Sequence, residues 1–196
     1  MPAGCGRNVH PERSVSTTLV LGGARSGKSA YAEKLAAQSG RAVLYIATAR
    51  PGDAEMAARI ARHRGDRPQH WQTVEEAVLL ADAILRHSTK DNLILVDCLT
   101  LWLSNLLFSD GANYPDVGAI TLPPLVAAQR AALLDALQVA PGEVVLVSNE
   151  VGMGIVPMGA VSRCFMDEAG RLNQAVAAVC TRAVFVAAGL PLPLKG

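Results

Sequence analysis

Eight consecutive residues near the beginning of the chain have the types and spacing that can hold a polyphosphate. They are Gly22, Gly23, Ala24, Arg25, Ser26, Gly27, Lys28 and Ser29. Glycines let the backbone turn so tightly that successive N–H groups point at phosphate oxygens. Lys28 adds a positive charge for the β- and γ-phosphates, and the Ser29 hydroxyl suits a Mg²⁺ ligand. The alternative, a glycine turn that happens to precede a helix, explains less of the pattern. The segment therefore predicts a P-loop that binds a nucleoside triphosphate or a closely similar molecule.

Polar residues follow two apolar segments that have the character of buried parallel strands. Residues 92–96 (NLILV) are followed by Asp97, the arrangement of a Walker B strand whose acid helps to hold Mg²⁺. Residues 42–47 (AVLYIA) are followed by Thr48, Ala49 and Arg50. Because the carboxyl ends of parallel strands face the ligand crevice, Thr48 and Arg50 are candidate nucleotide contacts. An ordinary exposed loop is the alternative for these two residues.

A lone histidine, His63, shares a helix face with two apolar residues. A helix is predicted over residues 53–64, and Met56, Ile60 and His63 are spaced i, i+4 and i+7 on it. The spacing alone favours a structural role, in which a partly charged imidazole stabilises the carboxyl end of the helix. A catalytic role is the alternative, and His70 is a weaker candidate of the same type.

These side chains have to be positioned by alternating strands and helices. Apolar runs predict strands at residues 17–21, 42–47, 92–96, 143–147 and 183–187. Helices are predicted at residues 28–38, 53–64, 99–108, 125–139 and 161–179, and a further one ends near residue 87. Thr73 and Glu76 match a capping box at the start of that further helix, which leaves Glu75 able to face the site. Residues 189–193 (GLPLP) are expected to leave the fold. The alternation predicts an α/β protein with a mostly parallel sheet and helices on both faces.

The bulk composition is that of one globular domain without a large charged surface. The chain has 196 residues, of which 51% are hydrophobic, and its formal net charge is +1. These values predict a single domain at residues 17–196 after a flexible extension at residues 1–16, with no nucleic-acid partner and no membrane span. The four cysteines lie far apart, and Cys98 and Cys180 are expected to be buried thiols, which favours the cytoplasm. From the residues alone, a small-molecule kinase, an NTPase switch and an ATP-driven motor all remain open.

Seven segments occur in an order that resembles a known family. They are GGARSGKS, LYIATAR, DAEMAARIARHRGDRP, WQTVEE, LVDCLTLWLSNLL, VSNEVGMGIVP and DEAGRLNQ. Together they resemble the bifunctional adenosylcobinamide kinase / adenosylcobinamide-phosphate guanylyltransferase family of cobalamin biosynthesis, over about residues 17–196. The P-loop occurs in many families, whereas VSNEVGMGIVP and the RIARHR segment are far more particular. The resemblance implies a RecA-like P-loop fold and a homo-oligomer, with a trimer as the expected form.

The resemblance implies two reactions. First, the hydroxyl of the aminopropanol arm of adenosylcobinamide is phosphorylated from ATP or GTP. Second, GTP donates GMP to that phosphate, which gives adenosylcobinamide-GDP and pyrophosphate. Guanylyl transfer in the family passes through a covalent GMP-histidine, which makes His63 the expected nucleophile, since a neutral imidazole has a free lone pair near pH 7. Some relatives carry two adjacent histidines where this chain has Arg62 and His63. A kinase that lacks guanylyl transfer is therefore a second hypothesis.

The resemblance also implies a wider set of nucleotide contacts. They are Thr48, Ala49, Arg50, Arg64, Gly65, Asp66, Arg67, Glu75 and Asp97. Lys28 and Mg²⁺ would neutralise the leaving pyrophosphate, and Ser29 and Asp97 are the expected Mg²⁺ ligands. The Glu75 carboxylate could accept hydrogen bonds from guanine N1–H and N2–H₂. A GTP-binding regulatory protein that does not turn over a corrinoid is a third hypothesis.

Overall fold

A computed structural model of the chain describes residues 16–50, 65, 68–109, 111 and 113–196. Its strands are β1 (Thr17–Gly22), β2 (Ala42–Ala47), β3 (Gln72–Glu75), β4 (Asn92–Asp97), β5 (Glu143–Asn149), β6 (Arg182–Ala187) and β7 (Leu190–Lys195). Its helices are α1 (Lys28–Gln38), α3 (Leu80–His87), α4 (Leu99–Leu107), α5 (Pro124–Val139) and α6 (Ala160–Val179). Residues 1–15 of the extension expected at residues 1–16, and the helix expected at residues 53–64, lie outside the described residues.

The strands form one seven-stranded sheet in the order β3-β2-β4-β5-β1-β6-β7. Every pairing among the first six strands is parallel. Only β7 runs antiparallel, beside β6. Parallel strands buried on both faces are built from continuous apolar runs, which is the pattern of β2, β4 and β5. The predicted α/β architecture with a mostly parallel sheet is confirmed.

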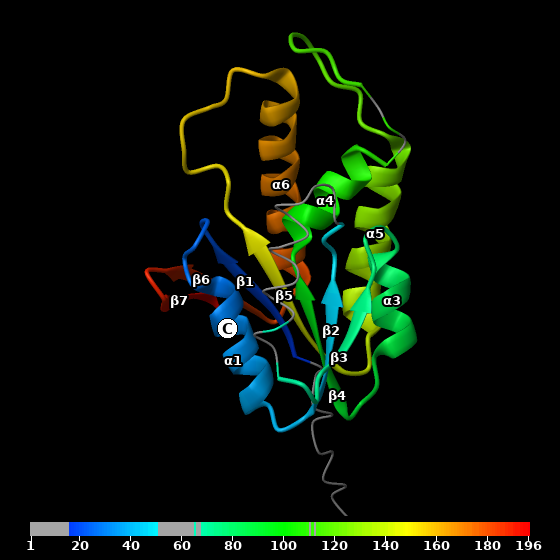
Figure 1. Cartoon of the computed structure of the whole chain (residues 1–196), viewed down its shortest axis with the longest axis vertical. Coiled ribbons are helices and arrows are strands. Elements are labelled where there is room, and N and C mark those ends of the chain that lie inside the picture. The colour runs from blue at the N-terminus through cyan, green and yellow to red at the C-terminus, as the bar shows by residue number, and fades with distance from the viewer. Residues whose placement is uncertain (1–15, 51–64, 66–67, 110, 112) are drawn as a thin grey trace, which may run out of the picture.

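Helices cover both faces of the sheet (Figure 1). Alternate residues of a strand point to opposite faces, and in β1 Leu19 and Leu21 belong to one apolar core whereas Val20 belongs to the other. The first core includes residues of α3, α4, α5 and α6, and Trp102 of α4 is fully buried in it. The second core includes Ala32 and Ala36 of α1. None of the described helices is long and apolar enough to cross a membrane.

The capping box predicted at Thr73 and Glu76 is wrong. Thr73 lies in the edge strand β3, which pairs with β2, and α3 begins only at Leu80. Glu76 instead accepts hydrogen bonds at Oε1 from the backbone N–H groups of Val78 and Leu79, each at 2.8 Å. A carboxylate two and three residues before these donors satisfies them without a helical turn. The local pattern was therefore that of a turn between strand and helix.

The prediction that residues 189–193 leave the fold is also wrong, because these residues begin β7. The register pairs Val186 with Pro191 and Val184 with Pro193. Proline cannot donate a ladder hydrogen bond, so it is tolerated on an edge strand when its missing N–H would point away from the sheet. Two prolines at alternate positions fit that arrangement, and they leave the outer edge of β7 with fewer donors.

Candidate functional site

The P-loop joins β1 to α1 at the carboxyl edge of the sheet, as the sequence predicts. Gly27 is the N-cap residue of α1 and has φ = 92°, a value that favours glycine. At Gly22 an added Cβ would lie 2.5 Å from the carbonyl oxygen of Val186 in β6. Both glycines are therefore required by the packing of the loop, and α1 presents its N-terminus to whatever the loop holds.

Lys28 is folded back against this loop. Its Nζ donates to the carbonyl oxygen of Gly23 at 3.2 Å, and the side chain is almost fully buried. The Ser26 hydroxyl is buried with no hydrogen-bond partner among the described residues. A buried ammonium and an unsatisfied hydroxyl within one tight turn of backbone N–H groups are the features of a phosphate cradle.

Asp97 ends β4 at the same edge of the sheet. One of its oxygens, Oδ2, accepts a hydrogen bond from the hydroxyl of Tyr45 in β2 at 2.9 Å. Burial and then the Asp97 charge raise the pKa of the neighbouring Cys98 thiol, whereas its hydrogen bonds to Thr100 and Leu101 and the charge of Lys28 oppose the shift. Because β1 and β4 belong to one parallel sheet with β5 between them, the P-loop and Asp97 lie at the same edge of it, and their pairing around a nucleotide stays a prediction.

The residues present fit a Mg²⁺ ion that is shared with phosphates. Among the described residues, no three His, Cys, Asp or Glu side chains gather as a protein-only metal site would require. Mg²⁺ is usually held by one or two protein oxygens together with phosphate oxygens and water. Ser29 at the start of α1 and Asp97 at the end of β4 supply such oxygens.

Thr48 forms hydrogen bonds with residues that follow β4, at the carboxyl edge of the sheet. It is fully buried, and its hydroxyl donates to the carbonyl oxygen of Cys98 at 2.8 Å and accepts from the Cys98 N–H at 2.9 Å. Asn105 of α4 donates to the Thr48 carbonyl at 2.7 Å. Asn149, at the end of β5, donates to Thr100 at 2.6 Å. These bonds join the ends of β2, β4 and β5, so the Thr48 side chain is already used for positioning.

The structure brings some of the other predicted contacts to the edge and leaves others untested. Ala49 and Arg50 follow β2, and Arg50 is exposed. Glu75 ends β3, four strands from β1 in the sheet, which is about 19 Å at the usual strand spacing. It therefore lies far from the P-loop phosphates. Gly65 is described and exposed, whereas His63, Arg64, Asp66 and Arg67 lie outside the described residues. Their roles stay predictions.

Tyr45, Asn105 and Asn149 are site residues that sequence reasoning missed. Tyr45 stands in an apolar run, where an aromatic residue reads as core, and its hydroxyl was the only signal of a partner. Asn149 follows an apolar strand in the same way as Asp97 does, so its position at the end of β5 could have identified it.

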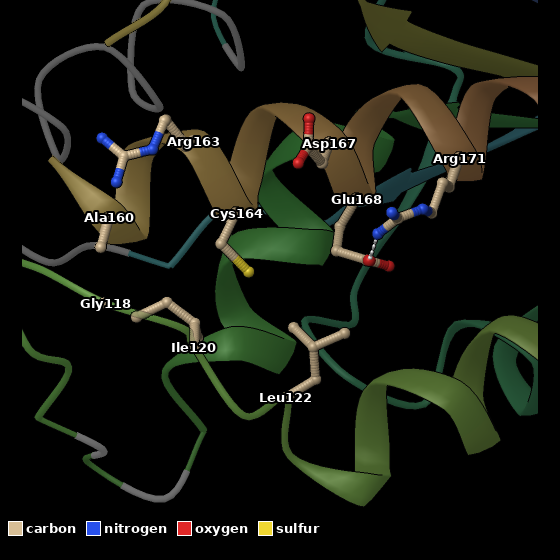
Figure 2. A pocket seen from close by; sticks show the side chains of 9 residues that line it. All are labelled: Gly118, Ile120, Leu122, Ala160, Arg163, Cys164, Asp167, Glu168 and Arg171. Carbon is tan, nitrogen blue, oxygen red and sulfur yellow. Dashed lines mark hydrogen bonds and ion pairs between the residues drawn. The ribbon is translucent and has the colours of Figure 1, made fainter. Parts of the chain in front are cut away.

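A hollow lies between α6 and residues 118–122 (Figure 2). Its volume is about 280 Å³, and Arg163, Cys164, Asp167, Glu168 and Arg171 of α6 line one side of it. Glu168 is almost fully buried and forms ion pairs with Arg130 of α5, at 3.1 Å, and with Arg171. Burial and the two neighbouring carboxylates, opposed by Arg171, raise the pKa of Cys164. Because the thiol is protonated and Glu168 is paired with two arginines, these side chains stabilise the packing of α6 against α5.

Comparison with known proteins gives matches over nearly the whole chain. A family model described as cobinamide kinase / cobinamide phosphate guanyltransferase matches residues 18–194. The bifunctional adenosylcobalamin biosynthesis protein CobP of Pseudomonas aeruginosa is 53% identical over 178 residues, which cover 91% of this chain and 96% of that protein. The bifunctional adenosylcobalamin biosynthesis protein CobU of Escherichia coli (strain K12) is 44% identical over 179 residues, which cover 90% and 98%.

The fold is also similar to that of solved ATPases. A prototypical ATPase from the type III secretion system of pathogenic bacteria aligns with a TM-score of 0.53 and 12% sequence identity. The alignment covers 91% of this chain and 56% of that one. At such low identity the similarity concerns the fold alone, and it agrees with a P-loop NTPase sheet.

Proposed function

The chain belongs to the cobinamide kinase / cobinamide phosphate guanyltransferase family, and we propose from this that it catalyses two successive reactions on adenosylcobinamide. The first transfers a phosphoryl group from ATP or GTP to the substrate hydroxyl. The second transfers GMP from GTP to the new phosphate. The observation that carries the proposal is the P-loop with its buried Lys28, at the same edge of the sheet as Asp97, in a chain that matches the family from residue 18 to residue 194.

In the kinase step, the substrate hydroxyl oxygen attacks the γ-phosphorus and the bond to the β,γ-bridging oxygen breaks. The P-loop N–H groups and Lys28 hold the phosphates and stabilise the charge that develops on the nucleoside diphosphate leaving group. Mg²⁺, held by Ser29 and Asp97, would supply further neutralisation of the phosphate oxygens. Tyr45 keeps the Asp97 carboxylate in a fixed orientation for this task.

In the guanylyl step, we assign the nucleophile to His63. A ring nitrogen attacks the α-phosphorus of GTP, the bond to the α,β-bridging oxygen breaks, and pyrophosphate leaves. An oxygen of adenosylcobinamide phosphate then attacks the GMP phosphorus, the P–N bond breaks, and the imidazole is restored. Ala49, Arg50 and residues 64–67 are further proposed nucleotide contacts, and Thr48 is proposed to hold this edge in place through its hydrogen bonds. Glu75, four strands from the P-loop, is a proposed contact to the guanine base and not to the phosphates.

The proposal extends to the setting of the enzyme. We propose a cytoplasmic homo-oligomer, a trimer by the family resemblance. Cys98, Cys164 and Cys180 are free thiols in the described part of the chain, which agrees with a reducing compartment.

Product analysis tests both reactions at once. Adenosylcobinamide is incubated with ATP, GTP and Mg²⁺, with GTP labelled at the α-phosphate, and the corrinoid products are separated. We expect the wild type to form adenosylcobinamide phosphate and then adenosylcobinamide-GDP, and to carry acid-labile label on the protein. His63→Ala should retain the kinase product, lose the labelled protein, and form at least a hundredfold less of the GDP-linked product, since covalent catalysis is lost.

His70→Ala is the matched control, because His70 is exposed and contacts Trp71 edge-on. It should behave as the wild type. Labelling that persists in His63→Ala and disappears in His70→Ala would move the nucleophile. Wild-type protein that forms only the phosphate would be a kinase without transferase activity, and protein that binds GTP without forming either product would be a regulatory protein.

A further inference from the structure

The segment between β5 and α6, residues 151–158, exposes an unusual share of apolar side chains. We call it the β5–α6 loop, and Figure 1 shows it rising from the tip of β5 to the start of α6. Ile155 is 98% exposed, Met158 92% and Met153 78%. Val151 and Val156 are exposed as well. Apolar side chains gathered in one exposed segment mark a binding surface more often than single ones do.

Hydrogen bonds fasten both ends of this loop. At the near end, the Glu150 N–H donates to the Gly22 carbonyl at 3.0 Å, and the Glu150 carboxylate accepts from the Gly152 N–H at 2.7 Å. At the far end, Arg163 donates to the carbonyl oxygens of Pro157, at 3.2 Å, and Met158. Both ends of the loop are thus fixed by hydrogen bonds, and the apolar side chains between them are exposed to solvent.

The near end of the β5–α6 loop lies beside the P-loop. Asn149 lies opposite Gly22 in the pairing of β5 with β1, and Glu150 follows it directly. A molecule seated on the loop would therefore lie beside the nucleotide phosphates. The other exposed apolar stripe, Leu190, Leu192 and Leu194 in β7, is antiparallel and runs toward the opposite edge of the sheet. Only Leu190, which follows Gly189, lies at the P-loop edge, and Leu192 and Leu194 lie farther along the strand.

The chemistry of the loop selects against anions. Residues 151–158 contain no charged side chain, and the charged residue that flanks them on the P-loop side is the acidic Glu150. A nucleotide, a nucleic acid or an anionic lipid would need basic side chains that the loop lacks. A large, uncharged or cationic ligand with apolar edges fits it.

We propose that the β5–α6 loop is the docking surface for the corrin ring of the substrate. This rests on the proposed function. The corrin ring of adenosylcobinamide has a methyl-bearing apolar rim, amide side arms and a net positive charge. The hollow on α6, at about 280 Å³, is smaller than the pockets that hold ordinary drug-sized molecules, so it is too small for a corrinoid. Docked on this loop, the ring would leave its hydroxyl-bearing arm to reach the P-loop.

Corrinoid binding and kinetics of loop variants test the proposal. In Ile155→Ser and in Met158→Ser a small hydroxyl side chain replaces an exposed apolar one without adding charge, which the fold tolerates because neither residue packs in the core. We expect the KM for adenosylcobinamide in the kinase step and its dissociation constant, from equilibrium dialysis followed by corrin absorbance, to rise at least tenfold. The KM for ATP should stay within twofold. Ile155→Leu should restore corrinoid binding.

Leu194→Ser is the matched control, since it makes the same uncharged replacement at an exposed leucine of β7. It should leave both constants unchanged. Loop variants that bind the corrinoid as the wild type does would overturn the proposal. If these variants also dissociated the oligomer, the loop would be a contact with a second copy of the chain. Dialysis separates this result from failure of the proposed function. A wild type that binds adenosylcobinamide through the loop but forms no phosphate supports the docking surface alone, whereas a wild type that does not bind it overturns both.

Discussion

At the scale of single residues, the site depends on partners that hold charged groups in place. Asp97 is the acid at the end of β4, and the Tyr45 hydroxyl fixes one of its two oxygens. Tyr45 itself is buried in the core that includes residues of α1. Because the ring is locked by packing, its hydroxyl presents a rigid donor, and Asp97 is left with Oδ1 for a cation or a water molecule.

Removal of the Tyr45 hydroxyl should weaken the binding of Mg²⁺ by Asp97. A hydrogen bond to a charged group is worth about 1.5–3 kcal/mol, so Tyr45→Phe should raise the Mg²⁺ concentration for half-maximal kinase rate by about ten- to a hundredfold. A Mg²⁺ titration of the rate measures this. Tyr31→Phe is the control, because Tyr31 lies on α1 and is only partly buried. An equal Mg²⁺ requirement in both variants would show that Tyr45 serves the core alone.

At the scale of elements, the hairpin between β6 and β7 supports the P-loop. The Gly189 N–H donates to the Ser26 carbonyl at 2.8 Å, and an added Cβ on Gly27 would lie 3.0 Å from the Gly189 Cα. Ala188 and Gly189 have φ values of 51° and 78°, as a tight two-residue hairpin turn of this kind requires. The turn between β6 and β7 thus stabilises the conformation of the P-loop, although the two segments are some 160 residues apart in the sequence.

A substitution in this hairpin should weaken nucleotide binding. In Gly189→Ala the backbone would keep φ = 78° only at a cost of about 1–2 kcal/mol, so the turn would relax away from Ser26. We expect an about five- to thirtyfold higher dissociation constant for GTP, measured by titration with a fluorescent analogue. Ala188→Gly relieves the neighbouring left-handed residue and should bind GTP as the wild type does. A Gly189→Ala protein with a lower melting temperature and an unchanged constant would limit the hairpin to a structural role.

At the scale of the whole molecule, the sheet decides which distant segments meet. The central P-loop strand β1 lies between β5 and β6, which come from the last third of the chain. This order joins the ends of β1, β4 and β5 at one edge, and it buries Cys180 at the end of α6. Burial raises the pKa of Cys180 to about 11, opposed by its hydrogen bond with Thr17 and by the charge of Lys195.

The raised pKa of Cys180 predicts a loss of stability in alkali. Below the ordinary value of 9.0 the thiol is protonated in both the folded and the unfolded chain, so it contributes no pH dependence. Between pH 9 and about 11 the unfolded chain releases the proton first, and the free energy of unfolding falls. Urea unfolding across this range should show the decline, and Cys180→Ala should make it shallower. Equal slopes in the two proteins would contradict the assignment.

Much of the fold could be predicted from the sequence because its signals are local. The bounds predicted for α1 and β2 agree with the structure, and those of the other predicted helices and strands that the structure describes agree within two residues. The exceptions are α3, which starts seven residues after the predicted capping residue Thr73, and the two edge strands β3 and β7, which were not predicted. Edge strands are short or carry prolines, and only their neighbours make them strands.

The chemistry of the chain is determined by the sequence itself, since the glycine spacing around Lys28 and the acid after an apolar strand are properties of adjacent residues. Their arrangement is decided only by the tertiary structure. It brings Tyr45 to Asp97, uses the Thr48 hydroxyl for positioning, and places Glu75 four strands from the P-loop. These outcomes depend on strand order and on contacts between segments far apart in the chain, which local periodicity does not encode.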